Sequence, residues 1–485
     1  MTTDLLVIHP GAQHGIFGAL GDQLTALEPP TWARMLAGYI RDRGYTTKII
    51  DAEAEGLAPE AVAERTEILN PRLVAIVAAG HQPSASTQQM TGAGAIARAI
   101  KRPRPDRQII MTGNHPSALP IRTLSEEAID YVADGEGVVT VEGLLAGDLP
   151  LDEVPGLVWR RALGGQVIAN QAAPLTDNLD QDLHGDVWDL LPMDRYRAHN
   201  WHAFTGPRRP YASIYTSLGC PFACQFCMIN SFQHVNRYRT FSPPRIVGHI
   251  EKLYYDYGVR SLKIADEMFV LKESHYLAIA QGIIDAGLDD LNIWAYARVD
   301  TVRPNTLSLL RAAGFRWLAL GIESGSAHVR DGAGKRLRTG DIVDVVRAVQ
   351  AADINVIGNF MFGLRDDTEA TMRQTLELAQ ACLPEFANFY CTMAYPGSPL
   401  YDQALREGWT LSSSWRAYSQ HNDDCRPLDT EHVDAATVLR FRDAAFRAYF
   451  NAPAYRDLVA RKFGSAASAD IDKMLSYRLT RKLLA

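Results

Sequence analysis

Three cysteines lie within eight residues of one another, in the stretch SLGCPFACQFC that ends at Cys227. Their spacing, Cys220-x3-Cys224-x2-Cys227, allows three thiolates of one loop to bind the same metal ion or metal cluster. A structural zinc site needs a fourth ligand, and no Cys-x2-Cys or His-x3-5-His pair stands nearby. A dithiol redox motif uses two cysteines and leaves the third unexplained. The pattern favours an iron–sulfur cluster with three protein ligands and one open iron site.

The other three cysteines, Cys382, Cys391 and Cys425, look isolated, and we expect them to be small buried apolar residues. Six cysteines are too few for a disulfide scaffold in 485 residues, which favours a reducing compartment. The chain has 49 Lys and Arg against 56 Asp and Glu, so its net charge of −7 gives no reason to expect nucleic acid as a partner. The N-terminus lacks a signal-peptide pattern and no long apolar run follows, so we predict a cytoplasmic protein without a membrane span.

Regular elements must position the three thiols, and residues 211–405 alternate between strand and helix patterns. The strand candidates are 214–217, 261–265, 292–296, 317–321, 356–362 and 388–393. The helix candidates are 242–256, 273–286, 303–313, 340–352 and 367–381. Six parallel strands with helical crossovers predict a complete or partial barrel, with the cysteines directly after its first strand.

Residues 1–150 show a second α/β pattern, which predicts a doubly wound parallel sheet. Its strand candidates are apolar throughout, as in strands that helices cover on both faces: 5–10, 47–51, 73–77 and 108–112. A helix is expected from Pro30 to Arg43, ending at Gly44. Glycine, proline and small polar residues gather after three of the strands, and ligands of such sheets bind at the carboxyl ends of the strands.

Two further segments complete the expected organisation. Residues 151–210 are rich in aromatic, charged and turn-forming residues, which predicts an irregular linker wrapped over its neighbours. Residues 406–485 are expected to be mostly helical, and their basic end, YRLTRKLLA, reads as a solvated face.

The cysteine motif, with an aromatic Phe226 before its last cysteine, resembles the signature of radical S-adenosylmethionine (SAM) enzymes. In that family the three thiolates hold a 4Fe-4S cluster, SAM chelates the open iron, and reductive cleavage of SAM gives a 5′-deoxyadenosyl radical. The family fold is a six-stranded partial barrel. The resemblance thus makes Cys220, Cys224 and Cys227 catalytic metal ligands, and it extends to further positions implied to bind SAM: Phe226, Asp266, Glu267, Arg298, Glu323 and Ser324.

The first 150 residues resemble the cobalamin-binding domain that precedes the barrel in one large subfamily. The matching stretches are EPPTWARMLAGYIRDRGYTTKIIDAE (28–53), TGNHPSALP (112–120) and DYVADGEGVVTVEGLL (130–145). The motif Asp-x-His-x-x-Gly, which supplies a histidine to cobalt in other modules, is missing, because Val187 stands where Asp182-Leu-His184 would need Gly. The resemblance implies cobalamin held without that histidine, by Gln13, His14, Pro30, His81, Gln82, Ser84, Gly113, Asn114, His115, Gly135 and Glu136.

Together these resemblances imply a cobalamin-dependent radical SAM methyltransferase. Its substrate is expected to be a small molecule, with an unactivated carbon or a phosphinate phosphorus as the methyl acceptor and flavodoxin or ferredoxin as the electron donor. The alternative is oxidative cyclisation or rearrangement, since HPGAQHG, HNWHAF and YASIYTSLGCPF are similar to the anaerobic magnesium-protoporphyrin ester cyclase group. A cobalamin-responsive regulator would not need the three cysteines.

The sequence gives little information about which residues contact the substrate. Tyr390, Cys391 and Tyr395 lie near the carboxyl end of the last strand candidate, and Trp201 and His202 lie in the expected linker. We interpret these residues as substrate candidates, with ordinary packing as the competing explanation.

Overall fold

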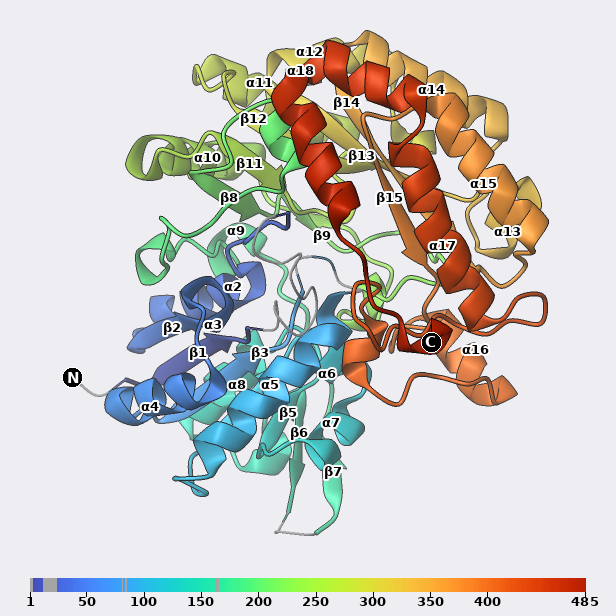
Figure 1. Cartoon of the computed structure of the whole chain (residues 1–485). Helices are drawn as coiled ribbons and strands as arrows, with labels where there is room; N and C mark the ends of the chain where they lie inside the picture. The colour runs from blue at the N-terminus through green and yellow to red at the C-terminus, as the bar shows by residue number, and fades with distance from the viewer. Residues whose placement is uncertain (1–2, 12–23, 81, 83–84, 162–164) are drawn as a thin grey trace.

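The computed structural model describes residues 3–11, 24–80, 82, 85–161 and 165–485. Two sheets dominate it, one in each half of the chain, and helices cover both (Figure 1). The predicted fold class is confirmed: an α/β chain with a Rossmann-like first sheet, a second parallel sheet and a helical C-terminal region.

The first sheet has seven strands in the order β2-β1-β3-β4-β5-β6-β7. Its first five strands are parallel: β1 (Leu5–His9), β2 (Thr47–Asp51), β3 (Leu73–Val77), β4 (Ile109–Thr112) and β5 (Tyr131–Ala133). Alternate residues of β1 enter different cores, with Leu5 and Val7 on one face and Leu6 and Ile8 on the other. The helices that cover the two faces are α2 (Thr31–Asp42), α3 (Ala52–Glu55), α4 (Pro59–Leu69), α5 (Ser86–Lys101), α6 (Asn114–Ala118), α7 (Pro120–Glu126) and α8 (Val138–Ala146).

The segment that we expected to be an irregular linker begins with strands of this same sheet. β6 (Leu157–Arg160) and β7 (Val167–Ala169) add to it antiparallel, beyond β5. Each strand has only three or four residues, too few for a hydrophobic period to identify it. The other helical pieces described in the segment are the short α-helix α9 (Leu179–Asp182) and three 3-10 turns, at Leu151–Glu153, Trp188–Leu190 and Trp201–Phe204.

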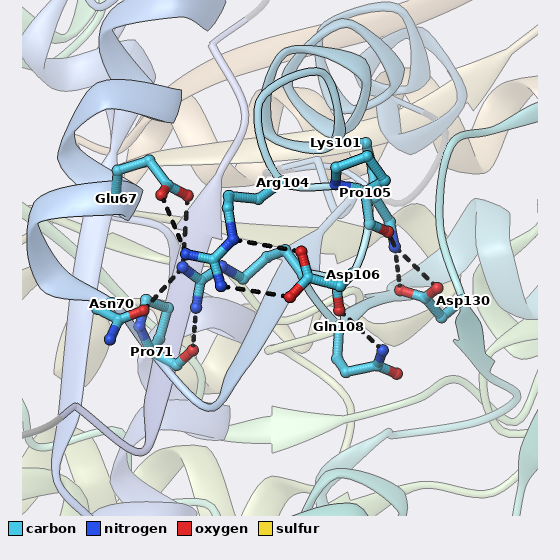
Figure 2. Close-up of polar contacts among 10 residues, drawn as sticks. Glu67, Asn70, Pro71, Lys101, Arg104, Pro105, Asp106, Gln108 and Asp130 are labelled. Carbon is cyan, nitrogen blue, oxygen red and sulfur yellow. Dashed lines mark hydrogen bonds and ion pairs between the residues drawn. The ribbon is translucent and has the colours of Figure 1, made fainter.

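The amino ends of β4 and β5 carry a self-contained polar network (Figure 2). Arg107 donates to the carbonyl of Pro71, to Asn70 and to Glu67, at 2.6, 2.9 and 3.3 Å. Lys101 binds both carboxylate oxygens of Asp130 at 2.8 Å, and Asp130 also accepts from the amide of Ile109. The charges at this edge are paired with one another, so the network is structural.

The second sheet is an open, all-parallel half-barrel in the order β15-β14-β13-β12-β11-β8. Its strands match the six candidates: β8 (Tyr211–Ile214), β11 (Ser261–Ile264), β12 (Asn292–Arg298), β13 (Phe315–Glu323), β14 (Asn355–Phe362) and β15 (Phe386–Cys391). The helices around it are α10 (Pro243–Tyr257), α11 (Glu273–Asp285), α12 (Leu307–Ala312), α13 (Ala327–Gly332), α14 (Thr339–Ala351) and α15 (Glu369–Cys382). β8 ends three residues before the predicted first strand does, and α13 was not expected.

The C-terminal region is helical, as predicted, and packs beside the last barrel strand (Figure 1). Its helices are α16 (Pro399–Glu407), α17 (Ala435–Phe450) and α18 (Pro453–Ser476). The expectation of a solvated basic end is wrong for Arg481, whose side chain is buried against Asp443 at 2.8 Å.

Buried polar contacts join the two halves. Arg34 of α2 donates to the carbonyls of Gly185 and Ser213, at 2.7 and 3.0 Å, and its guanidinium lies 3.7 Å from the ring centroid of Trp188. Lys263 of β11 binds Glu28 of the first domain at 2.9 Å, with both side chains buried. These contacts fix the binding edge of the first sheet against the barrel.

Candidate active site

The three cysteines occupy a loop framed by a short antiparallel pair, β9 (Ser217–Leu218) and β10 (Arg239–Thr240). Gly219 enters the loop with φ +82°, and a Cβ there would stand 2.1 Å from the carbonyl oxygen of Arg237. Only glycine tolerates both conditions. The local sequence Leu218-Gly219-Cys220 therefore turns the chain directly into the cysteine loop.

The thiols of Cys220, Cys224 and Cys227 are free and lie within electrostatic range of one another. Burial raises the pKa of the Cys220 thiol to about 11, and it raises the pKa of Cys227 as well. Arg298, at the end of β12, donates from Nη1 to the Sγ of Cys224 at 3.7 Å. The Arg298 guanidinium also binds both carboxylate oxygens of Asp300, at 2.9 and 3.0 Å, so its charge is already paired. Thiolates in this loop need positive charge to form, which a bound iron–sulfur cluster would supply.

Backbone hydrogen bonds hold the loop against the barrel. The amide of Gln225 donates to the carbonyl of Ala333 at 3.1 Å, and the amide of Leu400 donates to the carbonyl of Gln225 at 2.9 Å. Phe226 packs against the apolar residues Met361 and Leu364. Loop conformation is thus set by barrel segments far away in the sequence.

Among the described residues, no three His, Cys, Asp or Glu side chains stand close enough together to bind one metal ion. A 4Fe-4S cube makes a different demand, because each thiolate binds its own iron. The free thiols, their shared loop and Arg298 fit such a cube.

Asp266 and Glu267 follow β11 and both face the loop entrance. Asp266 is buried and accepts from the amide and hydroxyl of Thr216 and the hydroxyl of Ser217, each at 2.5 Å. Those bonds use Asp266 to hold the backbone before the cysteines. Glu267 accepts from the amide of Gly219 at 3.3 Å, and burial raises its pKa to about 8.

Glu323 and Ser324, at the end of β13, have different environments. Glu323 has φ +67°, lies at an irregularity in the pairing with β14, and accepts from Lys335 at 2.6 Å. Ser324 is fully buried, and its hydroxyl bonds the hydroxyl of Thr375 at 3.2 Å and accepts from the amide of Ser326. Glu323 therefore lines the site, while Ser324 shapes the turn.

A cavity of about 930 Å³ lies where the two domains meet. The cysteine loop contributes Phe226 and Cys227, the barrel contributes Glu323 and Tyr296, and the first domain contributes Gln82. The segment 418–421 and residues of α17 close another side. The cysteine loop, the barrel and the first domain thus each contribute side chains to one space, although the expected SAM and cluster residues Cys220, Cys224, Asp266, Glu267, Arg298 and Ser324 are not part of its lining.

The residues implied to bind cobalamin are placed unevenly. Gln82 lines the cavity, whereas Gln13, His14, His81 and Ser84 lie outside the described residues. Pro30 precedes α2 and lines a small neighbouring pocket. The lining of the large cavity does not include the others among the described residues: Gly113, Asn114, His115, Gly135 and Glu136.

Internal partners explain why two of those residues do not line the large cavity. Burial lowers the pKa of His115 to about 3, and its Nδ1 lies 3.2 Å from the hydroxyl of Thr87. Glu136 is buried in an ion pair with Arg239. Both act within the scaffold, and the sequence carried no sign of these partners.

The start of α5 offers cavity groups that the sequence did not reveal. The side-chain oxygens of Gln88 and Gln89 are buried without a hydrogen-bond donor among the described residues, and both residues line the cavity. Corrin carries peripheral amides whose N–H groups need acceptors. The two glutamines therefore fit the periphery of a corrin.

Tyr390, Cys391 and Tyr395 all line the cavity, as does Trp201. The neighbouring thiol of Cys425, together with burial, raises the pKa of the Cys391 thiol. His202 differs, because it is fully buried and donates from Nε2 to the carbonyl of Asn292 at 3.0 Å. Lys335, like the glutamines, was missed, since its pairing with Glu323 depends on how a separate loop folds back.

Two protein-family models match the chain. The B12 binding domain model matches residues 19–145, and the radical SAM superfamily model matches residues 214–379. The chain therefore carries a B12-binding domain ahead of a radical SAM domain. The class predicted from the cysteine motif and from the resemblance of the first domain, a cobalamin-dependent radical SAM enzyme with cluster, SAM and cobalamin as cofactors, is confirmed.

Individual relatives span most of the chain. An uncharacterized methyltransferase of Pyrococcus horikoshii is 28% identical over 419 residues, 86% of this chain and 86% of that protein. The anaerobic magnesium-protoporphyrin IX monomethyl ester cyclase of Cereibacter sphaeroides is 27% identical over 422 residues, 83% of this chain but 64% of the cyclase. The solved structure of the radical SAM methyltransferase TsrM from Kitasatospora setae, with cobalamin and a 4Fe-4S cluster, has a TM-score of 0.69 at 16% identity, covering 94% of this chain and 90% of that one. That last likeness shows a shared fold.

Proposed function

We propose that this enzyme transfers a methyl group from SAM, by way of cobalamin, to a carbon or a phosphinate phosphorus of a small molecule held in the interdomain cavity. The observation that carries the proposal is the shared lining: Cys227 of the cluster loop, Gln89 of the B12-binding domain and Tyr390 of the barrel face one space. When bound, the cluster with SAM supplies a hydrogen-abstracting radical and the cobalamin supplies the methyl group.

The chain contributes position, charge and the exclusion of water. Arg298, which is paired with Asp300, donates a hydrogen bond to the Sγ of Cys224, and Gln88 and Gln89 offer acceptors to corrin amides. Aromatic side chains such as Tyr296 and Tyr390 shield the space between the cofactors. The names of two relatives, both methyltransferases, support methyl transfer over other outcomes.

The test uses anaerobically reconstituted protein, methyl-labelled SAM and a reductant. We expect S-adenosylhomocysteine, with label retained by the protein-bound cobalamin, and 5′-deoxyadenosine from a second SAM. Cys224→Ala should abolish 5′-deoxyadenosine formation, whereas Cys382→Ala, a buried cysteine outside the loop, should retain it. Absence of S-adenosylhomocysteine would exclude methyl transfer.

A second candidate, oxidative cyclisation without methyl transfer, is favoured by the similarity to the ester cyclase. In that case the same assay would give 5′-deoxyadenosine alone.

Two further points belong to the proposal. An electron donor such as flavodoxin or ferredoxin would reduce the cluster, and the thiolate ligands call for a reducing compartment, the cytoplasm. Within the described part of the chain, no helix has both the length and the apolar character needed to cross a membrane.

A further inference from the structure

One side of the cavity is rich in guanidinium groups. We call it the C-terminal wall: Arg442, Asp443, Phe446 and Arg447 of α17 together with residues 474–479 after and at the end of α18. Arg442, Arg447 and Arg478 all line the cavity from this wall. Neither the cysteine loop nor the first domain contributes to it.

The single carboxylate of the wall is shared between two arginines. Asp443 binds Arg442 at 2.9 Å and Arg481 at 2.8 Å. Arg442 and Arg481 are both buried, and Arg442 also donates to the carbonyl of Phe389 at 2.9 Å. The single negative charge of Asp443 is thus shared by two guanidinium groups, those of Arg442 and Arg481.

Arg447 and Arg478 add further uncompensated charge. Arg447 donates to the carbonyls of Leu475 and Tyr477, at 3.2 and 3.0 Å, which hold its position without neutralising it. Arg478 is exposed. Neither side chain has a carboxylate partner within the described ranges of the chain.

Among the described residues, the other carboxylates that line the cavity do not balance this wall, because each has its own partner. Glu28 binds Lys263 at 2.9 Å, Glu53 lies 3.3 Å from His9, and Glu323 binds Lys335 at 2.6 Å. The histidines of the lining do not add to the balance: burial lowers the pKa of His199 to about 4, and burial with nearby Arg442 and Arg481 lowers that of His421 to about 3. Within the described lining, the unbalanced positive charge therefore lies on the C-terminal wall.

Next to this wall the barrel presents apolar and amide groups. Trp294, Tyr296 and Tyr390 line the cavity, and the side-chain amide of Asn388 donates to that of Asn359 at 2.9 Å across β15 and β14. Aromatic walls with a few fixed polar groups favour a flat or apolar molecular body.

We propose that the substrate of this enzyme is an anion, with a carboxylate or phosphate group bound by the C-terminal wall and an apolar body held between the barrel aromatics. The inference rests on the proposed function of the cavity as the methyl-acceptor site. Arginine forks bind both oxyanions in two-point geometry, so the wall recognises the chemistry that the two groups share.

The test compares matched probes on the reconstituted full chain by titration calorimetry. The probes are 3-phenylpropionate, 2-phenylethyl phosphate and the neutral 3-phenylpropionamide. We expect one of the anions to bind about tenfold more tightly than the amide, the effect of one charge-assisted hydrogen bond, and the favoured anion identifies the group. The preference should shrink as salt rises.

The double variant Arg447→Gln, Arg478→Gln should lose the preference, while Arg461→Gln, an exposed arginine of α18 outside the cavity lining, should keep it. Equal binding of anions and amide by the unaltered protein would overturn the proposal, as would no binding of any probe at millimolar concentration. Loss of bound cobalamin in the double variant would instead assign the wall to the cofactor's own phosphate. Probe binding needs no SAM cleavage, so its failure is distinguishable from failure of the methyl-transfer assay.

Discussion

Lys335 holds the side chain of Glu323, whose backbone has φ +67°. The two side chains are buried and their charged atoms are 2.6 Å apart. Gly321 leaves room for both, because a Cβ there would stand 2.5 Å from the Lys335 Nζ. The same loop touches the cluster motif, since Ala333 accepts from the amide of Gln225. Lys335 is thus a positioning residue for the site.

Replacing Lys335 with methionine should leave the buried carboxylate of Glu323 without its ion-pair partner. We expect a loss of about 3 kcal/mol in the free energy of unfolding, measured by urea denaturation, since breaking one side of a buried pair costs this much. SAM affinity, measured by equilibrium binding, should fall as well, while Lys335→Arg should restore part of both. The neighbouring Arg336→Met is the control, because Arg336 is exposed and its loss should cost under about 0.5 kcal/mol. Equal effects of the two methionine variants would refute the role of Lys335.

At the scale of elements, the β9–β10 pair and the loop between them decide where the thiols lie. The loop begins at Gly219, whose φ of +82° and close contact with the Arg237 carbonyl exclude a side chain. Asp266 accepts hydrogen bonds from Thr216, just before β9, and from Ser217, the first residue of β9. The cysteine loop is therefore held at its start by Asp266, which follows β11, and by close packing of Gly219 against the Arg237 carbonyl at the other end of the loop.

Gly219→Ala should force the loop open. We expect a loss of more than about 1 kcal/mol in stability, because a strained φ and a clash act together. Iron content after anaerobic reconstitution should fall, as measured by iron and sulfide analysis. Gly248→Ala, in α10 with nothing within 4 Å of the added Cβ, should leave iron content intact and raise stability slightly. Full iron loading of Gly219→Ala would show that the turn is not needed.

Across the whole molecule, packing keeps several histidines neutral. Burial lowers the pKa of His202 and His249 to about 3, as it does for His115 and His421, and to about 4 for His199. Their pKa values in the folded chain lie below the ordinary 6.5, so the unfolded chain takes up protons first as the pH falls. Stability is therefore present above pH 6.5 and is lost from there down towards pH 3 to 4.

His202→Gln tests this pH dependence, because glutamine can still donate to the Asn292 carbonyl. Between pH 7.5 and 5.5 each buried histidine should cost about 1.4 kcal/mol in the free energy of unfolding. The decrease in the free energy of unfolding from pH 7.5 to pH 5.5, measured by urea denaturation, should be about 1.4 kcal/mol smaller in His202→Gln than in the unaltered chain. His328→Gln, at an exposed position of α13, should show the same fall as the unaltered chain. An unchanged fall in His202→Gln would contradict the assignment.

The sequence by itself determined the two α/β halves, the barrel strands and the cysteine loop. Near-continuous apolar strands and helical periods are local signals, and so is the Cys-x3-Cys-x2-Cys spacing. It did not reveal β6 and β7, which are too short to show a period. It also placed His115, Glu136 and His202 among binding candidates, although each is engaged inside the scaffold.

Only the tertiary structure decided which side chains share the cavity. Gln89 and Tyr390 are separated by about three hundred residues of sequence, and Lys335 meets Glu323 because a loop returns to the end of β13. The Arg442, Arg447 and Arg478 wall forms because α17 packs on β15 and the chain after α18 folds back beside it. Charge balance across a cavity depends on distances between such segments, and no sequence pattern encodes those distances.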